Sequence, residues 1–324
     1  MVTETAPLVR ALAGIARGAA HPAGTRDSCA ACGRPGGPVL ADRADATVVR
    51  HGRAVAKAHA PDTDADAHRV RLAVAAHPRL DGILLPPLPV APAEAHGRPV
   101  SAWPYGTPVD PDDPDAAPWE ETATLLARLH SVPPAELPGP LPPMRGPAKA
   151  ARAVERMRAA PPHPGAAPVL AAWARLPAWA RGEAPPPRAG TVCHGDLHLG
   201  QLVRHPASTG RWHLIDVDDL GLGDPAWDLA RPAAWYAAGL LAPAVWARFL
   251  GAYRAAGGPA VPPDGDPWPQ LDVPARALTV QTAALALAKS AAELREPDEV
   301  ELSVIDACAR IASLPPDLAA EASA

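Results

Sequence analysis

The chain has 324 residues, a length that accommodates one large domain or two unequal ones. Its formal net charge is −5, with 35 acidic and 30 basic side chains, so it lacks the strong basic excess of a nucleic-acid-binding protein. Proline is abundant, at 44 residues, but apolar residues make up 48% of the chain, and we therefore expect it to fold. Only three of the basic residues are lysines: Lys57, Lys149 and Lys289.

The sequence contains no segment typical of secretion or of membrane insertion. Arg10 and Arg17 interrupt the apolar residues near the N-terminus, where a signal peptide would be continuous. The charge-free stretch 232–247 includes two prolines, and it is shorter than the roughly 20 apolar residues of a membrane span. We therefore expect a cytoplasmic protein with no membrane partner and no nucleic-acid partner. The sequence indicates nothing about its oligomeric state.

Cys29 and Cys32 have a spacing that is found in zinc sites, because two thiolates three residues apart can bind one tetrahedral ion. A structural zinc ion needs four ligands, and no second Cys-x-x-Cys pair follows. His21 is the one candidate nearby for a third ligand. We therefore expect Cys29 and Cys32 to be two reduced thiols in a turn rich in glycine and proline.

The first hundred residues predict a small sheet with one helix. β-prone runs at 46–50 and 54–59 flank a turn that contains a glycine, a pattern typical of a hairpin within residues 39–60. A helical pattern then covers 63–77, and a further strand is expected at 99–103.

From residue 118 onward the pattern becomes helical. The segment from Trp119 to His130 carries an apolar stripe and stops before two prolines, as expected of a helix. After a proline-rich connector at 133–147, the pattern predicts further helices at 149–160, 168–181, 226–256 (with a break at Pro243), 274–295 and 298–313.

Between two of these helices lies a segment rich in acidic residues. The sequence H-G-D-L-H-L-G-Q occupies 194–201, and I-D-V-D-D at 215–219 ends a predicted strand. A turn at 208–210 predicts a hairpin, which would place Asp196 and Asp216 on neighbouring strand ends. Carboxylates gathered at one point repel each other unless a cation compensates them, and a hard dication is the natural occupant of such a site.

H-G-D at 194–196, followed by Gln201 five positions after the Asp, resembles the catalytic loop of the aminoglycoside phosphotransferase family, which usually has Asn at the last position. With His198 and Gln201, the loop is especially similar to that of maltokinases and related sugar kinases. L-I-D, G-D-P and D-L-A, within residues 214–230, match the second motif of the family. The resemblance extends over about residues 48–230.

The resemblance implies an α+β, bilobal protein-kinase-like fold. Residues 1–102 would form a small, nucleotide-binding N-terminal lobe with a mixed β-sheet. Residues 103–324 would form a larger, mostly helical C-terminal lobe that holds the catalytic loop and the acceptor-binding helices. The implied reaction transfers the γ-phosphate of ATP, with Mg²⁺, to a hydroxyl of a small polar molecule such as a sugar, an amino sugar or an aminoglycoside.

The resemblance also implies roles for individual residues. Asp196 would be the catalytic base that receives the proton of the acceptor hydroxyl, and Gln201 and Asp216 would bind Mg²⁺. Lys57, on a predicted strand, would contact the α- and β-phosphates of ATP. Asp228 is expected to hold the catalytic loop through hydrogen bonds rather than to touch the substrate.

The segment after the strand at 99–102 resembles the hinge of these kinases. The backbone near Ala102 would hydrogen-bond the adenine, and Trp103 or Tyr105 would pack on the base. The acceptor is less well defined, but residues 149–181 carry more arginine than acid, which argues against a polycationic acceptor.

The chain departs from the family at the glutamate that normally pairs with the strand lysine. No glutamate follows Lys57 in the next helix, and Asp66 is the candidate to replace it. Lys149 and Lys289 have no role that the sequence assigns, and we expect both to tolerate arginine better than Lys57 does.

Two other interpretations stay open. His194, Asp196 and His198 alternate as if on one face of a strand, and with Asp216 they could form the site of a metal-dependent hydrolase. The missing glutamate is also compatible with a degenerate kinase-like protein that binds a nucleotide without turnover.

Overall fold

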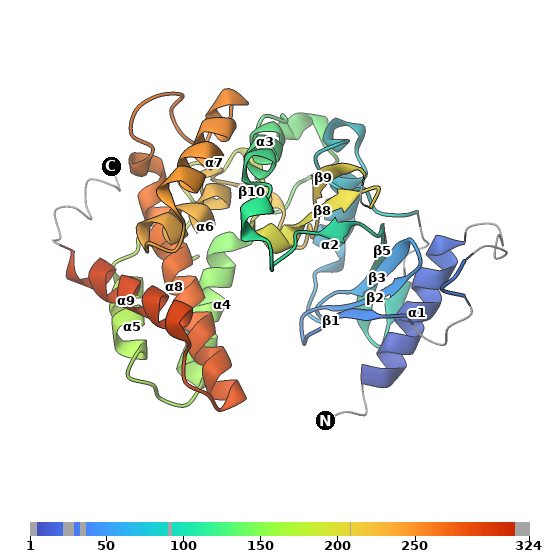
Figure 1. Cartoon of the computed structure of the whole chain (residues 1–324), viewed down its shortest axis with the longest axis horizontal. Coiled ribbons are helices and arrows are strands. Elements are labelled where there is room, and N and C mark those ends of the chain that lie inside the picture. Colours follow the sequence, from blue (N-terminus) through green and yellow to red (C-terminus); the bar gives the residue numbers. More distant parts are fainter. Residues whose placement is uncertain (1–4, 22–28, 33–36, 90–92, 208, 315–324) are drawn as a thin grey trace. The chain divides into compact units, whose positions relative to one another are not determined.

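The structure is a computed structural model that describes residues 5–21, 29–32, 37–89, 93–207 and 209–314. It has the expected α+β fold, with a strand-rich N-terminal part and a helical C-terminal part (Figure 1). The chain forms two compact units. The first contains the described residues of Met1–Asp115, Leu137–Pro140 and Gly200–Asp218, and the second those of Ala116–Glu136, Leu141–Leu199 and Asp219–Ala324.

A five-stranded sheet forms the centre of the first unit. Its strand order is β1-β2-β3-β5-β4, and every pair among the described strands is antiparallel. The predicted hairpin is confirmed by β2 and β3, and Gly52 supplies the positive φ of +54° that their turn requires. The strands are β1 (Val39–Asp42), β2 (Thr47–His51), β3 (Ala54–Ala58), β4 (Ala93–Ala95) and β5 (Arg98–Pro104).

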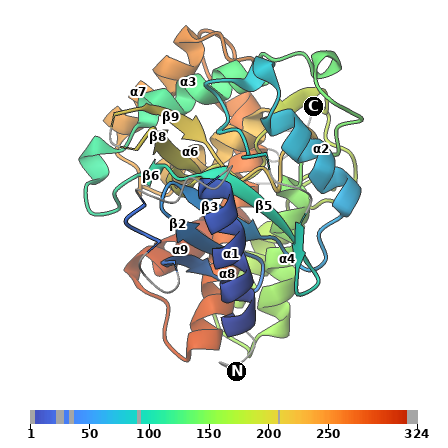
Figure 2. The ribbon, with the colours of Figure 1, turned by 90° about the vertical axis from the view of Figure 1, so that its right-hand side faces the viewer.

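One helix that the sequence reading did not anticipate, α1 (Thr5–Ala20), packs on this sheet (Figure 2). Leu8, Leu12 and Ala16 recur every four residues and form its buried face, which packs in one core with Val49 and Ala56 of the sheet. The predicted end of the small lobe at residue 102 falls inside β5, and the first compact unit continues to Asp115.

The remainder of the first unit consists of a helix and a second, smaller sheet. The predicted helix is present as α2 (Ala65–Ala75), capped by Asp64, whose side chain accepts a hydrogen bond of 2.8 Å from Ala67 N. β8 (Leu202–His205) and β9 (Arg211–Leu214) form the predicted hairpin, and β6 (Thr107–Pro108) pairs with β8.

The second unit is mostly helical. Its helices are α3 (Trp119–His130), α4 (Gly146–Ala159), α5 (Ala166–Ala174), α6 (Ala226–Ala237), α7 (Pro243–Ala255), α8 (Trp268–Glu293) and α9 (Glu299–Ser313), and β7 (Thr191–Cys193) pairs with β10 (Gly221–Gly223). Short 3₁₀ turns occur at Pro78–Leu80, Pro114–Ala116, Pro134–Glu136 and Leu199–Gln201. None of the helices in the described part of the chain is long and apolar enough to cross a membrane.

Two helices differ most from the expected bounds, in each case at a proline. α5 ends at Ala174 instead of continuing to residue 181, because Pro177 restricts the residue before it to non-helical conformations. α8 begins at Trp268 rather than at residue 274, and Pro274 lies within it, among buried neighbours that stabilise the helix by packing.

We expect Tyr253→Phe to destabilise the second unit. The Tyr253 side chain is fully buried, and its hydroxyl accepts a hydrogen bond of 3.0 Å from Ala260 N and bonds His130 Nδ1 at 2.7 Å. Loss of the hydroxyl leaves two buried polar groups without this partner, which should lower the free energy of unfolding by about 1–3 kcal/mol. Urea denaturation measures this change, with Tyr236→Phe as the control, because Tyr236 stacks on Trp246. Equal stability of the two variants would contradict the prediction.

Candidate active site

In the first unit, Lys57 binds two carboxylates that lie far from it in the sequence. Its Nζ atom is 2.6 Å from Asp216 Oδ1 and 3.0 Å from Asp218 Oδ2, and Lys57 and Asp216 are 159 residues apart in the sequence. Burial alone would lower the pKa of Lys57, but the two carboxylates outweigh it and raise the pKa above its ordinary value. The ammonium group is therefore charged throughout the neutral pH range.

The backbone places Gln201 beside the segment that carries Asp216. Ile215, the residue before Asp216, donates its N–H to Gln201 O at 2.9 Å. Asp216 itself has a positive φ of +65°, a conformation that few residues other than glycine adopt. The structure thus brings three of the predicted site residues, Lys57, Gln201 and Asp216, into one compact unit.

The side chains of Asp216 and Gln201 fit a magnesium ion. Both offer oxygen atoms, the ligands that this hard cation prefers. Asp218 has a different environment, because its Oδ1 atom lies 2.8 Å from His59 Nδ1 while its Oδ2 atom binds Lys57. Burial raises the pKa of Asp218 less than Lys57 and His59 lower it, so the carboxylate stays ionised. Asp218 therefore holds Lys57 from a second side.

The acidic partners of Lys57 thus come from the segment after β9 rather than from α2. The expectation for Asp66 was wrong, because Asp66 is exposed and forms a surface ion pair of 2.8 Å with Arg69. On its buried side, α2 presents His68, whose ring lies 4.1 Å from that of His59. Burial lowers the pKa of His68 to about 4, so its imidazole is neutral at pH 7.

In the second unit, Asp196 follows β7 and is held by two cations. Lys149 Nζ on α4 lies 2.6 Å from its Oδ2 atom, and Arg231 Nη2 on α6 lies 3.2 Å from its Oδ1 atom. Burial would raise the pKa of Asp196, but the charges of Lys149 and Arg231 outweigh it and hold the pKa well below its usual range. The carboxylate is therefore ionised at every pH at which the protein would work.

Lys149 is a site residue that the sequence reading missed. Besides Asp196 it binds Asp219 Oδ2 at 2.7 Å, so one ammonium group bridges two carboxylates. These contacts give Lys149 a place in the structure that the sequence did not assign, and its tolerance of arginine stays a prediction. The scarcity of lysine could have pointed to Lys149, since only three lysines occur in a chain whose other basic residues are arginines.

The fully buried Asp228 fixes the H-G-D loop through the backbone, as expected. It accepts hydrogen bonds from His194 N at 2.6 Å and Gly195 N at 2.7 Å, and it lies 3.0 Å from His130 Nε2. Gly195 has a φ of +86°, and a Cβ atom there would lie 2.4 Å from the carbonyl oxygen of Asp219. Glycine is required at this position for both reasons.

This network also defines the role of His130. Because Asp228 is an acceptor, His130 donates from Nε2 and accepts at Nδ1 the proton of the Tyr253 hydroxyl. A chain of hydrogen bonds therefore runs from the core of the second unit to the loop that carries Asp196.

The strand pairing differs from the expected one around the two aspartates. β8 pairs with β9, whereas β7, the strand before Asp196, pairs with β10. Asp196 and Asp216 therefore do not end two paired strands. Three clusters of His, Cys and acidic ligand atoms occur among the described residues, and neither Asp196 nor His198 belongs to any of them. This arrangement gives no support to the hydrolase interpretation.

The predicted hinge residues take part in the packing of the first unit. The carbonyl oxygen of Ala102 accepts a hydrogen bond of 2.8 Å from Leu88 N, and the buried Trp103 donates its indole N–H to Ser101 Oγ at 2.8 Å. The ring of Tyr105 lies against the guanidinium of Arg50, whose Cζ atom is 3.3 Å from the ring centre. An adenine contact by these residues stays a prediction.

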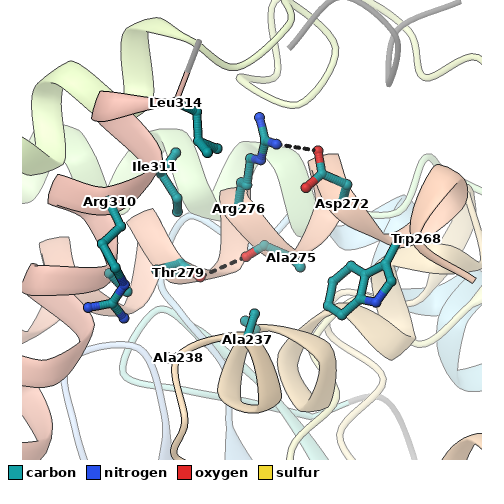
Figure 3. A pocket seen from close by; sticks show the side chains of 12 residues that line it. Ala237, Ala238, Trp268, Asp272, Ala275, Arg276, Thr279, Arg310, Ile311 and Leu314 are labelled. Atoms are coloured by element: carbon teal, nitrogen blue, oxygen red, sulfur yellow. Dashed lines mark hydrogen bonds and ion pairs between the residues drawn. The ribbon is translucent and has the colours of Figure 1, made fainter. Parts of the chain in front are cut away.

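Two hollows are found in the second unit. A small one is lined by residues next to Asp196, including Leu197, His198 and Arg231. A larger one of about 190 Å³ lies among α6, α8 and α9 and is lined mainly by alanine and other apolar side chains (Figure 3). Asp272 and Arg276 form an ion pair of 2.9 Å at its wall. None of the predicted site residues lines the larger hollow.

Several solved structures resemble this fold. A choline/ethanolamine kinase family protein from Mesorhizobium loti has 16% identity and a TM-score of 0.58, over 96% of this chain and 98% of its own. A thermostable mutant of an aminoglycoside phosphotransferase, in a ternary complex with AMP-PNP and hygromycin B, has 14% identity and a TM-score of 0.57, over 90% and 97%. A spectinomycin phosphotransferase, in complex with ADP and spectinomycin, has 13% identity and a TM-score of 0.52, over 90% and 91%.

The comparison with curated protein sequences gave no match. The model of the phosphotransferase enzyme family, in contrast, matches residues 38–271, which include β3 with Lys57, the H-G-D loop and the segment of Asp216. This match spans more than half of the chain. The chain therefore belongs to the phosphotransferase enzyme family.

Proposed function

We propose that this protein is a small-molecule kinase that transfers the γ-phosphate of ATP to a hydroxyl group. The observation that carries the proposal is the ion pair of 2.6 Å between Lys57 and Asp216, which joins two separate motifs of the family in one unit. A lysine on a strand beside a carboxylate that can bind Mg²⁺ is the pairing that phosphate recognition needs. The AMP-PNP and the ADP bound to similar phosphotransferases support the choice of nucleotide.

Asp196 is the residue proposed to accept the proton of the acceptor hydroxyl. Lys149 and Arg231 each bind one of its oxygens, but an ionised carboxylate has about four lone-pair sites, so room remains for a hydroxyl donor. Lys57 neutralises phosphate charge. Mg²⁺, held by Asp216 and Gln201, would supply further charge compensation on the phosphate oxygens. Asp228 keeps the loop of Asp196 in place.

The surroundings of Asp196 favour an acceptor without several positive charges. Lys149, Arg231 and Arg145, which lies 3.5 Å from Asp219, form a cationic cluster around the carboxylates. A polycationic aminoglycoside would be repelled by this cluster, whereas a neutral or anionic sugar would not. Among the predicted acceptors we therefore propose a sugar, and the similarity to hygromycin- and spectinomycin-bound structures supports only the general class of hydroxyl acceptors.

A screen for acceptor-dependent ATP consumption tests the function directly. The screen covers neutral sugars, sugar acids, amino sugars, aminoglycosides and amino alcohols, and we expect turnover with a neutral or anionic sugar. Asp196→Asn should lower kcat about 10²- to 10⁴-fold, the usual contribution of a general base, and leave ATP binding in place.

The alternatives predict different outcomes in the same screen. Wild-type protein that binds Mg-ATP but turns over with no acceptor would indicate the degenerate kinase. Chelator-sensitive hydrolysis without ATP would indicate the hydrolase. Absence of both ATP binding and turnover would contradict the kinase proposal.

We expect Lys57→Arg to impair the use of ATP far more than Lys289→Arg. The planar guanidinium cannot place one point charge between Asp216 and Asp218 as the ammonium does, whereas Lys289 is exposed on α8. The kcat/KM for ATP should fall roughly ten- to hundredfold, because a hydrogen bond to a charged group contributes about 1.5–3 kcal/mol. Steady-state kinetics at varied ATP concentration measure the effect, and equal losses in both variants would refute the assignment of Lys57.

Lys149→Met should change the pH dependence of the reaction. Lys149 holds the pKa of Asp196 low, so the variant should have a higher Asp196 pKa. A base is lost as the pH falls through its pKa, and the acidic limb of the kcat/KM profile should therefore move to higher pH. Lys289→Met is the matched control and should keep the wild-type profile. A profile of Lys149→Met that has lower activity but an unmoved acidic limb would show that Lys149 has only a structural role.

A further inference from the structure

Four side chains of types that bind transition metals converge at the end of α1. They are His21, Cys29, Cys32 and His51, and one ligand atom of each lies within 4.8 Å of all the others. His21 directly follows α1, and His51 is the last residue of β2. Cys29 and Cys32 face the same point because a turn joins them, closed by a hydrogen bond of 3.0 Å from Cys32 N to Cys29 O.

Three of the distances between these atoms are close to the edges of a tetrahedral site. Cys32 Sγ lies 3.2 Å from His21 Nε2 and 3.4 Å from His51 Nε2, and Cys29 Sγ lies 3.9 Å from His51 Nε2. Ligands at about 2.3 Å for sulfur and about 2.0–2.1 Å for nitrogen, arranged tetrahedrally around zinc, stand about 3.3–3.8 Å apart. All four side chains can therefore reach one ion with only small movements.

We propose that His21, Cys29, Cys32 and His51 bind a structural zinc ion. The set of two thiolates and two imidazoles is one of the common structural zinc sites, and it leaves no open position for a substrate. Two thiolates also neutralise the dication, so the complex carries no net charge where it is partly buried. Zinc, a borderline-soft ion, fits this set better than magnesium or calcium, which prefer oxygen ligands.

Hydrogen bonding alone explains this cluster less well than a bound metal ion does. Cys32 Sγ is in reach of two imidazole nitrogens at once, and because a thiol is only a weak donor and a weak acceptor, hydrogen bonds would hold this arrangement weakly. The imidazole of His51 is almost fully buried, so a ligand atom at this position is shielded from solvent. The four Cys residues are free thiols in the structure.

The proposed site replaces the expectation of two unligated thiols. The fourth ligand, His51, is 19 residues away from Cys32 and lies on a strand, so no local spacing in the sequence indicates it. The ion would join the end of α1 to the β2–β3 turn, where Arg53 Nε already donates to Ala20 O at 3.2 Å. Its effect would reach the sheet that carries Lys57, because α1 packs on β2 and β3.

Metal analysis of the untagged full-length chain, purified without chelator, tests the proposal. We expect about one zinc ion per chain in the wild type. Cys32→Ser and His51→Asn should each lose most of this zinc. Cys308→Ala is the matched control, because Cys308 is a buried cysteine on α9, and it should retain the metal.

A second measurement does not depend on whether the variants fold. Wild-type protein stripped of metal and titrated with Co²⁺ should develop thiolate-to-cobalt charge-transfer bands together with the intense visible bands of a tetrahedral site. Zn²⁺ should then displace the cobalt and abolish both sets of bands. Adding a chelator to the zinc-loaded wild type should lower its Tm.

Three results would overturn the proposal. The first is wild-type protein that contains no zinc and gives no thiolate bands with Co²⁺. The second is zinc retained at the wild-type level in both Cys32→Ser and His51→Asn. The third is a disulfide between Cys29 and Cys32 in freshly purified protein, detected by thiol titration. None of these readouts requires ATP. The zinc proposal can therefore be refuted while the kinase proposal is supported, and the kinase proposal can be refuted while the zinc proposal is supported.

Discussion

In each unit of this molecule, one lysine ammonium group contacts two aspartates. The pairs are Lys57 with Asp216 and Asp218 in the first unit, and Lys149 with Asp196 and Asp219 in the second. Buried carboxylates without a cation would repel one another and take up protons. Removing the lysine from such a group leaves its carboxylates without this compensation. The ionised state of the site therefore depends on these two ammonium groups.

The two lysine clusters each include one of two consecutive residues, Asp218 and Asp219. Asp218 belongs to the first unit and the next residue, Asp219, to the second. Lys57 therefore holds the chain on one side of this bond and Lys149 on the other. The backbone N–H of Arg145 also donates to Asp219 O at 3.1 Å, which fixes the second side further.

The parts of the structure that depend on local pattern could be predicted from the sequence, and those that depend on distant partners could not. Strand and helix periodicity indicated β3 and α3, and the H-G-D loop indicated Asp196. The partners of Lys149 are 47 and 70 residues away, on segments without a shared pattern. For the same reason, the sequence did not indicate that His51 lies beside the two cysteines. It also did not indicate the acidic partners of Lys57, which we had expected in the helix that follows Lys57 in the sequence.

The preference for lysine at these two positions follows from geometry. Each Nζ atom meets two carboxylates, at 2.6 and 3.0 Å for Lys57 and at 2.6 and 2.7 Å for Lys149. An ammonium group has three donors around one point and can satisfy two separate carboxylates, whereas the flat guanidinium fork suits one carboxylate in a bidentate pair. Arg188 illustrates that case, with Nε and Nη2 both bound to Asp224 at 3.2 and 2.7 Å. Two of the three lysines in this chain, Lys57 and Lys149, thus stand where one charge is shared between two acids.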